Sequence, residues 1–228
     1  MDASEIRYNQ QKAVNDYYRM QYGPFLTNET INPLTESFYQ EIKKILGKYL
    51  NHETELLEIG CGLGRVTFEA NLSNIQRGVG TDISQAFITE CNLIHKNSSQ
   101  VVNYAVIDPN NSLDFQVADA QNLPFRNQEF NCVVCLNLID RVPQPTKVAE
   151  EVTRVSSDGA ILMICYPYDW QDKYTEPTNR VENIHQLFSS DEWETLEEVE
   201  HLPFRCYSHA RKYVHFDNHL IVFKKIAR

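Results

Sequence analysis

The sequence predicts an α/β fold: a mostly parallel sheet with an antiparallel C-terminal strand and an N-terminal helical cap. Three observations support this prediction. Short apolar runs alternate with helical stretches from residue 55 onward, a pattern typical of a parallel sheet with helices on both faces. Residues 1–50 are polar and helical in pattern. The last apolar run follows the turn dipeptide Asp217-Asn218.

The cap is predicted from apolar side chains at helical spacing. They are Val14, Tyr17 and Tyr18 in a first helix and Phe38, Ile42, Ile45 and Leu46 in a second. The dipeptide Gly23-Pro24 should end the first helix, and residues 32–35, which include a proline, should begin the second.

The core is predicted from apolar runs and the helical segments between them. The expected strands are residues 55–59, 78–82, 114–117, 130–136 and 160–166. The expected helices are residues 68–70, 85–95 and 147–155. A hairpin arm is expected at 101–107, because the turn residues Pro109, Asn110 and Asn111 follow it.

The order changes after residue 188. We expect a helix near residues 190–198, an apolar run at 206–214 and a last strand at 219–225. Because Asp217-Asn218 favours a turn, this last strand should insert antiparallel beside the parallel ones.

Length and composition predict a single domain, residues 1–228, with the cap at 1–50 and the core at 51–228. The net charge of -10 repels phosphate backbones and anionic lipid headgroups, so neither nucleic acid nor a membrane is an expected partner. No apolar stretch approaches the ~20 residues of a membrane helix, and no signal segment is recognisable. We therefore expect a cytoplasmic protein.

The six cysteines are expected to be reduced core thiols. Cys132 and Cys135 have the spacing of a redox or zinc pair, but they lie in an expected strand, where residues three apart point to opposite faces. No second Cys or His pair stands at zinc-finger spacing, and no spacing of two histidines and a carboxylate indicates an iron site. The sequence therefore predicts no metal.

A glycine-rich turn follows the first expected strand, with Glu58, Gly60, Gly62 and Gly64 at alternate positions. Alternate glycines allow left-handed backbone and a close approach to a ligand, although a structural turn has the same pattern. Glu58 would repel the phosphates of a dinucleotide. An acid at this place instead suits the positively charged amino-acid portion of S-adenosylmethionine.

Two further acids close later strands. Asp82 ends the second strand, where a carboxylate can accept hydrogen bonds from both ribose hydroxyls of an adenosyl ligand. Asp119 follows the third strand, where it can accept from an adenine amino group while the next backbone N–H serves a ring nitrogen. Open α/β sheets bind ligands beyond the carboxyl ends of their strands, where all three acids fall.

With these motifs, residues 55–166 resemble the core of class I S-adenosylmethionine-dependent methyltransferases. The resemblance implies a Rossmann-like sheet of seven strands and S-adenosylmethionine as cofactor, with S-adenosylhomocysteine as product. It places Asn137, at the end of the fourth strand, near the methionine portion. The expected cofactor-binding residues are Glu58, Gly60, Cys61, Gly62, Gly64, Arg65, Asp82, Ile83, Asp119, Ala120 and Asn137.

Three downstream segments resemble the methyltransferase domain of ovothiol biosynthesis. They are residues 137–143, 166–170 with Tyr174 and Thr175 close behind, and 202–204 with 209–213. The resemblance implies methylation of a ring nitrogen of 5-thiohistidine, also called 4-mercaptohistidine. It also implies that the chain works beside a separate iron-dependent sulfoxide synthase.

Such a zwitterionic acceptor needs a cation for its carboxylate, an anion for its ammonium group and aromatic walls for its ring. The expected substrate-binding residues are Tyr22, Asp140, Arg141, Tyr168, Trp170, Arg211 and Tyr213. Asp140 and Tyr168, just past strand ends, are the candidate catalytic bases. Two alternatives stay open: methylation of another small amine, thiol or carboxylate, and a non-catalytic domain that binds the cofactor as a partner or sensor.

Overall fold

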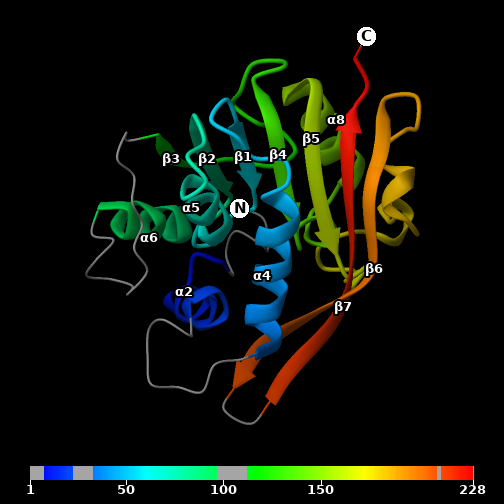
Figure 1. Ribbon diagram of the computed structural model, residues 1–228. Helices are drawn as coiled ribbons and strands as arrows, with labels where there is room; N and C mark the ends of the chain where they lie inside the picture. The colour runs from blue at the N-terminus through cyan, green and yellow to red at the C-terminus, as the bar shows by residue number, and fades with distance from the viewer. Residues whose placement is uncertain (1–7, 23–32, 97–111, 210–211, 228) are drawn as a thin grey trace.

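The computed structural model describes residues 8–22, 33–96, 112–209 and 212–227. Its centre is a seven-stranded sheet in the order β3-β2-β1-β4-β5-β7-β6 (Figure 1). The strands are β1 (Glu55–Ile59), β2 (Arg77–Asp82), β3 (Leu113–Val117), β4 (Phe130–Leu136), β5 (Ser156–Tyr166), β6 (Trp193–His209) and β7 (Lys212–Lys225). Strands β1 to β5 pair in parallel and β7 pairs antiparallel with β5 and β6, which confirms the predicted fold class.

Helices cover both faces of the parallel strands, which accounts for the nearly continuous apolar runs. The helices of the core are α5 (Arg65–Asn71), α6 (Gln85–Lys96) and α8 (Pro145–Val155). Leu57 packs in the cluster that contains the apolar side of α8, while its neighbour Leu56 packs with α4 and α5 on the other face. Cys132 and Cys135 also divide between these two clusters, as predicted for a strand. Burial raises the pKa of both thiols to about 12.

The N-terminal segment is helical, as predicted: α2 (Gln11–Tyr17) runs into one π-helical turn, η1 (Tyr18–Tyr22), and α4 (Pro33–Leu46) follows. Val14 is buried against the glycine loop and α6. In α4, the predicted apolar set is buried on the sheet: Phe38, Ile42, Ile45 and Leu46. Gly23-Pro24 and the expected hairpin arm at 101–107 lie outside the described residues.

The expected helix near residues 190–198 is wrong, because β6 begins at Trp193. The expected run at 206–214 falls on the end of β6 and the start of β7, and its residues 210–211 lie outside the described residues. Trp193 is buried while the acids after it are largely exposed, as befits an edge strand whose charges face water. Tertiary pairing with β7 therefore overrides the acidic pattern that favoured a helix.

The β6–β7 hairpin extends beyond the sheet. Its register with β5 ends at His219, and residues 202–209 and 212–218 continue as a two-stranded ribbon, the hairpin arm, past one end of α4 (Figure 1). Phe204 of the arm packs on Phe38 of α4, with ring centroids 4.7 Å apart. In the described part of the chain, no helix has the length and apolar character needed to cross a membrane.

Candidate functional site

A cavity of about 680 Å³ lies at the carboxyl ends of the parallel strands. Residues at the ends of β1 to β4 line one side, and residues of α2, η1, α4 and the hairpin arm line the others. In Figure 1, α2 lies beyond the strand ends and the hairpin arm passes the lower end of α4. This edge is where open α/β sheets bind ligands, and the volume suits a small molecule.

The glycine loop after β1 has the left-handed backbone that the sequence predicts. Gly60, Gly62 and Gly64 have φ of 72°, 57° and 79°. Gly60 lines the cavity, whereas Gly62 and Gly64 face protein atoms. A Cβ at Gly62 would lie 2.9 Å from the Tyr17 ring, and one at Gly64 would lie 2.7 Å from Phe115. Side chains are therefore excluded by packing as well as by backbone conformation.

Glu58 supports the loop and also lines the cavity. Its Oε2 accepts hydrogen bonds from the Thr67 backbone N–H at 2.8 Å and from the Thr67 hydroxyl at 2.5 Å. Thr67 is in the first turn of α5, whose N-cap is Gly64, so Glu58 supplies the side-chain cap that glycine lacks. Burial raises the pKa of Glu58 to about 7, against the opposing effect of the Thr67 bonds. A cation in the cavity would favour its ionised form.

Asp82 closes β2 and anchors the loop. Its Oδ2 accepts from the backbone N–H of Gly62 at 3.0 Å, and its Oδ1 accepts from that of Ser84 at 2.9 Å. Burial raises the pKa of Asp82 to about 6, although these backbone bonds lower it. Because each carboxylate oxygen has a second lone pair, Asp82 keeps acceptor capacity toward the cavity that it lines.

The next strand ends extend this row of polar groups. Asp119 and Ala120 follow β3, and Asp119 Oδ1 accepts from the Gln121 backbone N–H at 2.9 Å. Asn137 follows β4 with a left-handed φ of 53°, and its side-chain oxygen accepts from Asn218 at 2.8 Å. The cavity brings together nine of the predicted site residues: Glu58, Gly60, Asp82, Ile83, Asp119, Ala120, Asn137, Asp140 and Arg141.

Asp140 combines burial with an open oxygen. Only 1% of its surface is exposed, and its Oδ2 accepts from the Asp169 backbone N–H at 3.0 Å and lies 3.1 Å from Arg141 Nη1. Its Oδ1 is buried and has no hydrogen-bond partner among the described residues. Burial raises the pKa of Asp140 to about 6, while the Arg141 charge lowers it. Buried polar atoms are rarely left unpaired, and this oxygen has the capacity to accept from a donor of a ligand.

Arg141 is already engaged. Its Nη2 lies 2.7 Å from Asp169 Oδ2, and its Nη1 donates to the Asp169 carbonyl at 2.6 Å. Its guanidinium therefore faces the cavity as part of an ion pair, and it can bind a substrate carboxylate only if Asp169 gives way.

Cys61 lies away from the cavity, and so does Arg65. Its guanidinium, 1% exposed, pairs with Glu36 and Glu69 at 3.0 Å each and donates to the Gln21 carbonyl at 2.6 Å. It also stacks over the Tyr39 ring, 4.1 Å from the centroid. Arg65 therefore joins η1 and α4 to the glycine loop rather than facing a ligand.

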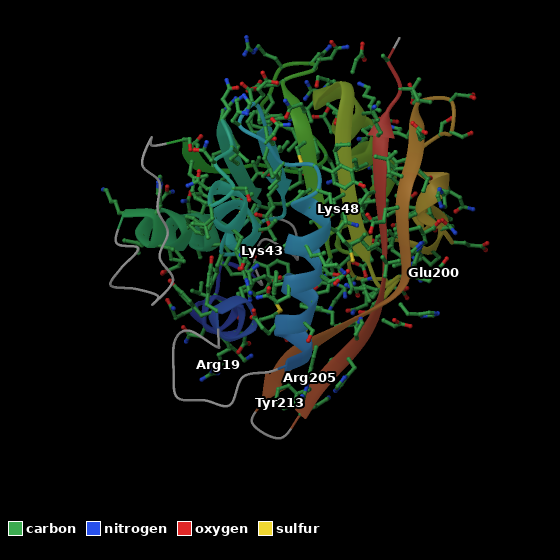
Figure 2. All side chains as sticks on the ribbon, viewed as in Figure 1. Arg19, Lys43, Lys48, Glu200, Arg205 and Tyr213 are labelled. Atoms are coloured by element: carbon green, nitrogen blue, oxygen red, sulfur yellow. The ribbon has the colours of Figure 1, made fainter. Side chains whose placement is uncertain are left out.

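The predicted aromatic walls also lie elsewhere. Tyr22 is fully buried, with its hydroxyl donating to the Leu63 carbonyl at 2.9 Å. Tyr168 and Trp170 line a separate hollow with Arg180. Tyr213 is exposed near the end of the hairpin arm, where Arg205 stacks on its ring (Figure 2). Arg211 lies outside the described residues.

Other side chains form the wall opposite the strand ends. These are Tyr17, Met20 and Gln21 of the N-terminal helices, Tyr39 of α4, and Phe204, Val214 and Phe216 of the hairpin arm. Their sequence signals are weak, because a helical or alternating apolar pattern does not tell which other segment the side chains meet. The high content of aromatic residues in 8–22 is the sequence feature that could have indicated that this segment contributes to the wall.

Known proteins share sequence and fold with this chain. Residues 57–164 match a sequence family described as a methyltransferase domain. Over 140 residues the chain is 26% identical to the ubiquinone biosynthesis O-methyltransferase of Methylococcus capsulatus. The aligned region covers 61% of this chain and 52% of that protein. The chain thus spans about half the length of the curated relatives it matches.

Solved structures share the fold at low sequence identity. A methyltransferase from Methanosarcina mazei has a TM-score of 0.60 at 18% identity, covering 81% of this chain and 98% of that one. Magnesium protoporphyrin IX methyltransferase from Synechocystis has a TM-score of 0.63 at 12% identity, covering 97% of each chain. The strand order, the match of residues 57–164 to the methyltransferase-domain family and these likenesses together show that the chain has the fold of class I S-adenosylmethionine-dependent methyltransferases.

Proposed function

We propose that this chain transfers a methyl group from S-adenosylmethionine to a ring nitrogen of 5-thiohistidine. The donor rests on one observation above all: Glu58, Asp82 and Asp119, from three adjacent strand ends, line one cavity with the glycine loop. The acceptor rests on the buried open oxygen of Asp140 beside Arg141, within the segment that resembles the ovothiol family.

The residues present fit the donor. All five residues concerned line the cavity. Asp82 has acceptor capacity for ribose hydroxyls, and the Asp119 carboxylate with the Ala120 backbone N–H could recognise an adenine. Glu58 and Asn137 have oxygens for a cationic amino-acid end. Magnesium protoporphyrin IX methyltransferase, which shares the fold, was solved with S-adenosylhomocysteine bound. The wall of helices and hairpin arm would exclude water from the transfer.

S-adenosylmethionine, when bound, supplies an electrophilic methyl group on a sulfonium. The acceptor nitrogen must present a neutral lone pair in line with the methyl–sulfur bond, so positioning carries most of the rate. As the nitrogen–carbon bond forms, the carbon–sulfur bond breaks and its electron pair stays on sulfur. The methylated ring is then an imidazolium and releases its remaining N–H proton.

We assign Asp140 as the group that accepts this proton. With a pKa of about 6, set mainly by burial, it is largely ionised at neutral pH and can still accept a proton from an imidazolium. Its Oδ1 accepts from no donor in the part of the chain that the structure describes, so a ring N–H or an ammonium group can use it. Tyr168, the other candidate base, lies at the separate hollow with its hydroxyl 2.6 Å from His219 Nδ1, which makes it the weaker candidate.

The test is a methylation assay by mass spectrometry. Purified chain, S-adenosylmethionine and 5-thiohistidine should give a product heavier by one CH₂ together with an equivalent of S-adenosylhomocysteine. Histidine without the thiol is the matched substrate control. The iron-dependent sulfoxide synthase that would supply the thiolated ring is the partner that this proposal implies.

A second candidate follows from the curated relatives, which are named as O-methyltransferases of ubiquinone biosynthesis. An aromatic hydroxyl compound in the same assay would be methylated in place of the thiohistidine if the chain transfers the methyl group to oxygen. Donor binding without turnover of either acceptor would contradict both proposals and favour a cofactor-binding partner or sensor.

A further inference from the structure

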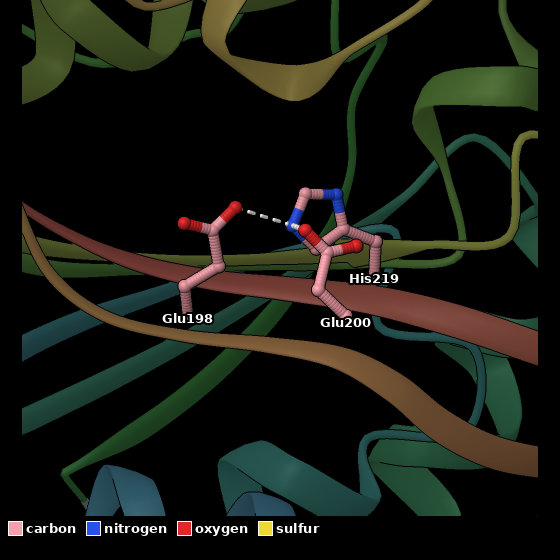
Figure 3. Close-up of side chains that lie close together, drawn as sticks. All are labelled: Glu198, Glu200 and His219. Atoms are coloured by element: carbon pink, nitrogen blue, oxygen red, sulfur yellow. Dashed lines mark hydrogen bonds and ion pairs between the residues drawn. The ribbon is translucent and has the colours of Figure 1, made fainter.

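A cluster of one histidine and two glutamates lies at the base of the hairpin arm, outside the cavity. His219 is on β7, and Glu198 and Glu200 are on β6 (Figure 3). One ligand atom from each of the three residues lies within 4.8 Å of the others. Sequence spacing did not reveal this cluster, because its members meet only through the pairing of the two strands.

The imidazole is held in place from both sides. His219 has 5% of its side chain exposed, its Nδ1 lies 2.6 Å from the Tyr168 hydroxyl and its Nε2 lies 2.7 Å from Glu198 Oε1. Metal-binding histidines commonly have their second ring nitrogen fixed in this way by a hydrogen-bond partner. The Nε2 atom is thereby directed at the two carboxylates.

The distances suit a small divalent ion. Nε2 is 2.7 Å from Glu198 Oε1 and 3.8 Å from Glu200 Oε1. Ligand atoms at zinc–ligand lengths in a tetrahedron stand about 3.4 Å apart, between these two values. A second imidazole is near, since His185 Nε2 lies 3.2 Å from the same Glu198 oxygen.

The charges also call for a cation. Within the described parts of the chain, the ion pairs of Glu198 and Glu200 are all with imidazoles and none is with a lysine or arginine. Two carboxylates so close repel each other unless a positive charge lies between them. Glu200, 67% exposed, lies on the outer edge of the sheet, so an ion could enter from water (Figure 2).

We propose that Glu198, Glu200 and His219 bind one first-row divalent transition-metal ion, typified by Zn²⁺, with His185 or water completing the shell. One imidazole and two carboxylates favour such an ion over Mg²⁺ or Ca²⁺, which prefer oxygen alone. The ion would tie β6 to β7 and, through His219 and Tyr168, hold the segment that follows β5. The role is structural and independent of the proposed acceptor.

The test uses Co²⁺ and Zn²⁺ on the metal-free full chain. We expect one equivalent of Co²⁺ to produce visible absorption typical of a tetrahedral nitrogen and oxygen site, and Zn²⁺ to displace it. At about 100 times its Kd, Zn²⁺ should raise Tm by about 5 °C. His219→Gln should abolish both effects, and Glu200→Gln, at an exposed position, should weaken Co²⁺ binding at least about tenfold.

The matched control is His201→Ala. His201 forms the same kind of pair in the same hairpin, with Nδ1 2.7 Å from Asp217 Oδ2, but both side chains are exposed. The His201→Ala variant should bind both ions as the wild type does. Unchanged affinity in His219→Gln and Glu200→Gln, no saturable binding, or an intense near-ultraviolet band from thiolate ligands would each overturn the proposal.

Discussion

The two sides of the cavity are built in different ways. The strand-end side consists of residues 58–60, 82–83, 119–120 and 137, each at or just after the end of a strand of the sheet. The opposite wall combines α2, η1 and α4 with the hairpin arm, which lie far apart in the sequence. The first side can be specified by short local motifs, whereas the second exists only when distant segments pack together.

This difference suggests that the two sides have different binding roles. Backbone turns and acids at strand ends recognise the parts of a donor that do not vary, and they need little more than the sheet to hold them. A wall of helices and a long hairpin can change in shape without disturbing the sheet. We therefore expect changes on the strand-end side to affect the donor and changes in the opposite wall to affect the acceptor.

The largest effect is expected where the two sides are joined. Arg65→Leu leaves Glu36, Glu69 and the Gln21 carbonyl without their shared cation, and breaking such a buried pair costs about 3–5 kcal/mol. Urea unfolding should show that loss. The exposed pair of Lys44 with Glu41 provides a control, since Lys44→Ala should leave the unfolding free energy unchanged. Equal stability of the Arg65 variant and the wild type would show that the two sides are not joined here.

The next effect concerns the donor alone. Asp82→Ala removes the carboxylate that holds the Gly62 N–H and would accept the ribose hydroxyls, so the Kd for S-adenosylmethionine should rise about 100-fold. Calorimetric titration measures it. Asp114→Ala, at an exposed position of the neighbouring strand β3, should bind as the wild type does. Donor affinity within threefold of wild type in Asp82→Ala would remove this residue from the site.

A tenfold effect is expected from pH. Burial raises the pKa of Glu58 to about 7, so the free chain is protonated there below this pH, and a cationic donor favours the ionised form. The Kd for S-adenosylmethionine should therefore be about tenfold higher at pH 6 than at pH 8. Glu58→Gln cannot ionise, and its Kd should change much less over this range. A wild-type Kd that is the same at both pH values would contradict the assigned contact.

The same pKa gives a stability prediction of opposite sense to that of a salt-bridged acid. Because the folded-state pKa of Glu58 lies above its ordinary value of 4.5, the folded state binds this proton more tightly than the unfolded state. Its contribution favours folding at low pH and is lost as pH rises from about 4.5 through 7. Thermal unfolding of Glu58→Gln should lack that part of the pH dependence that the wild type shows.

The smallest effect should fall on the acceptor. Phe216 lines the cavity from the hairpin arm and is only partly buried, so Phe216→Ala should raise the acceptor KM about fivefold with donor Kd unchanged. Leu196→Ala, at an exposed position on β6, is the control in the same strand pair. A loss of donor affinity as large as that of acceptor affinity would end the distinction between the two sides.

The features that the sequence could predict are those of the strand-end side, and the features that it could not predict depend on distant segments. Strands β1 and β4 were predicted with their observed ends, and Glu58, Asp82 and Asn137 were placed at one edge, because periodicity and turn residues are local signals. The acidic stretch after Trp193 was predicted as a helix, since only its pairing with β7 makes it a strand.

Side-chain direction was beyond local signals in the same way. Tyr168 stands just past β5, as the pattern indicated, but its left-handed φ of 56° and its bond to His219 place it at another hollow. Arg65 follows the glycine loop, yet the acids of α4 and α5 hold it away from the cavity. In both cases the partner lies on an element that sequence spacing does not identify.

We propose that one cavity holds the donor along the strand ends and faces the acceptor toward Asp140 and the hairpin arm. A crystal structure of the chain with S-adenosylhomocysteine tests it most directly. We predict the ribose against Asp82, the adenine beside Asp119 and Ala120, and the sulfur on the side of Asn137 and Asp140. Binding outside this cavity, or with the two ends of the ligand exchanged, would contradict this placement of the donor and the acceptor.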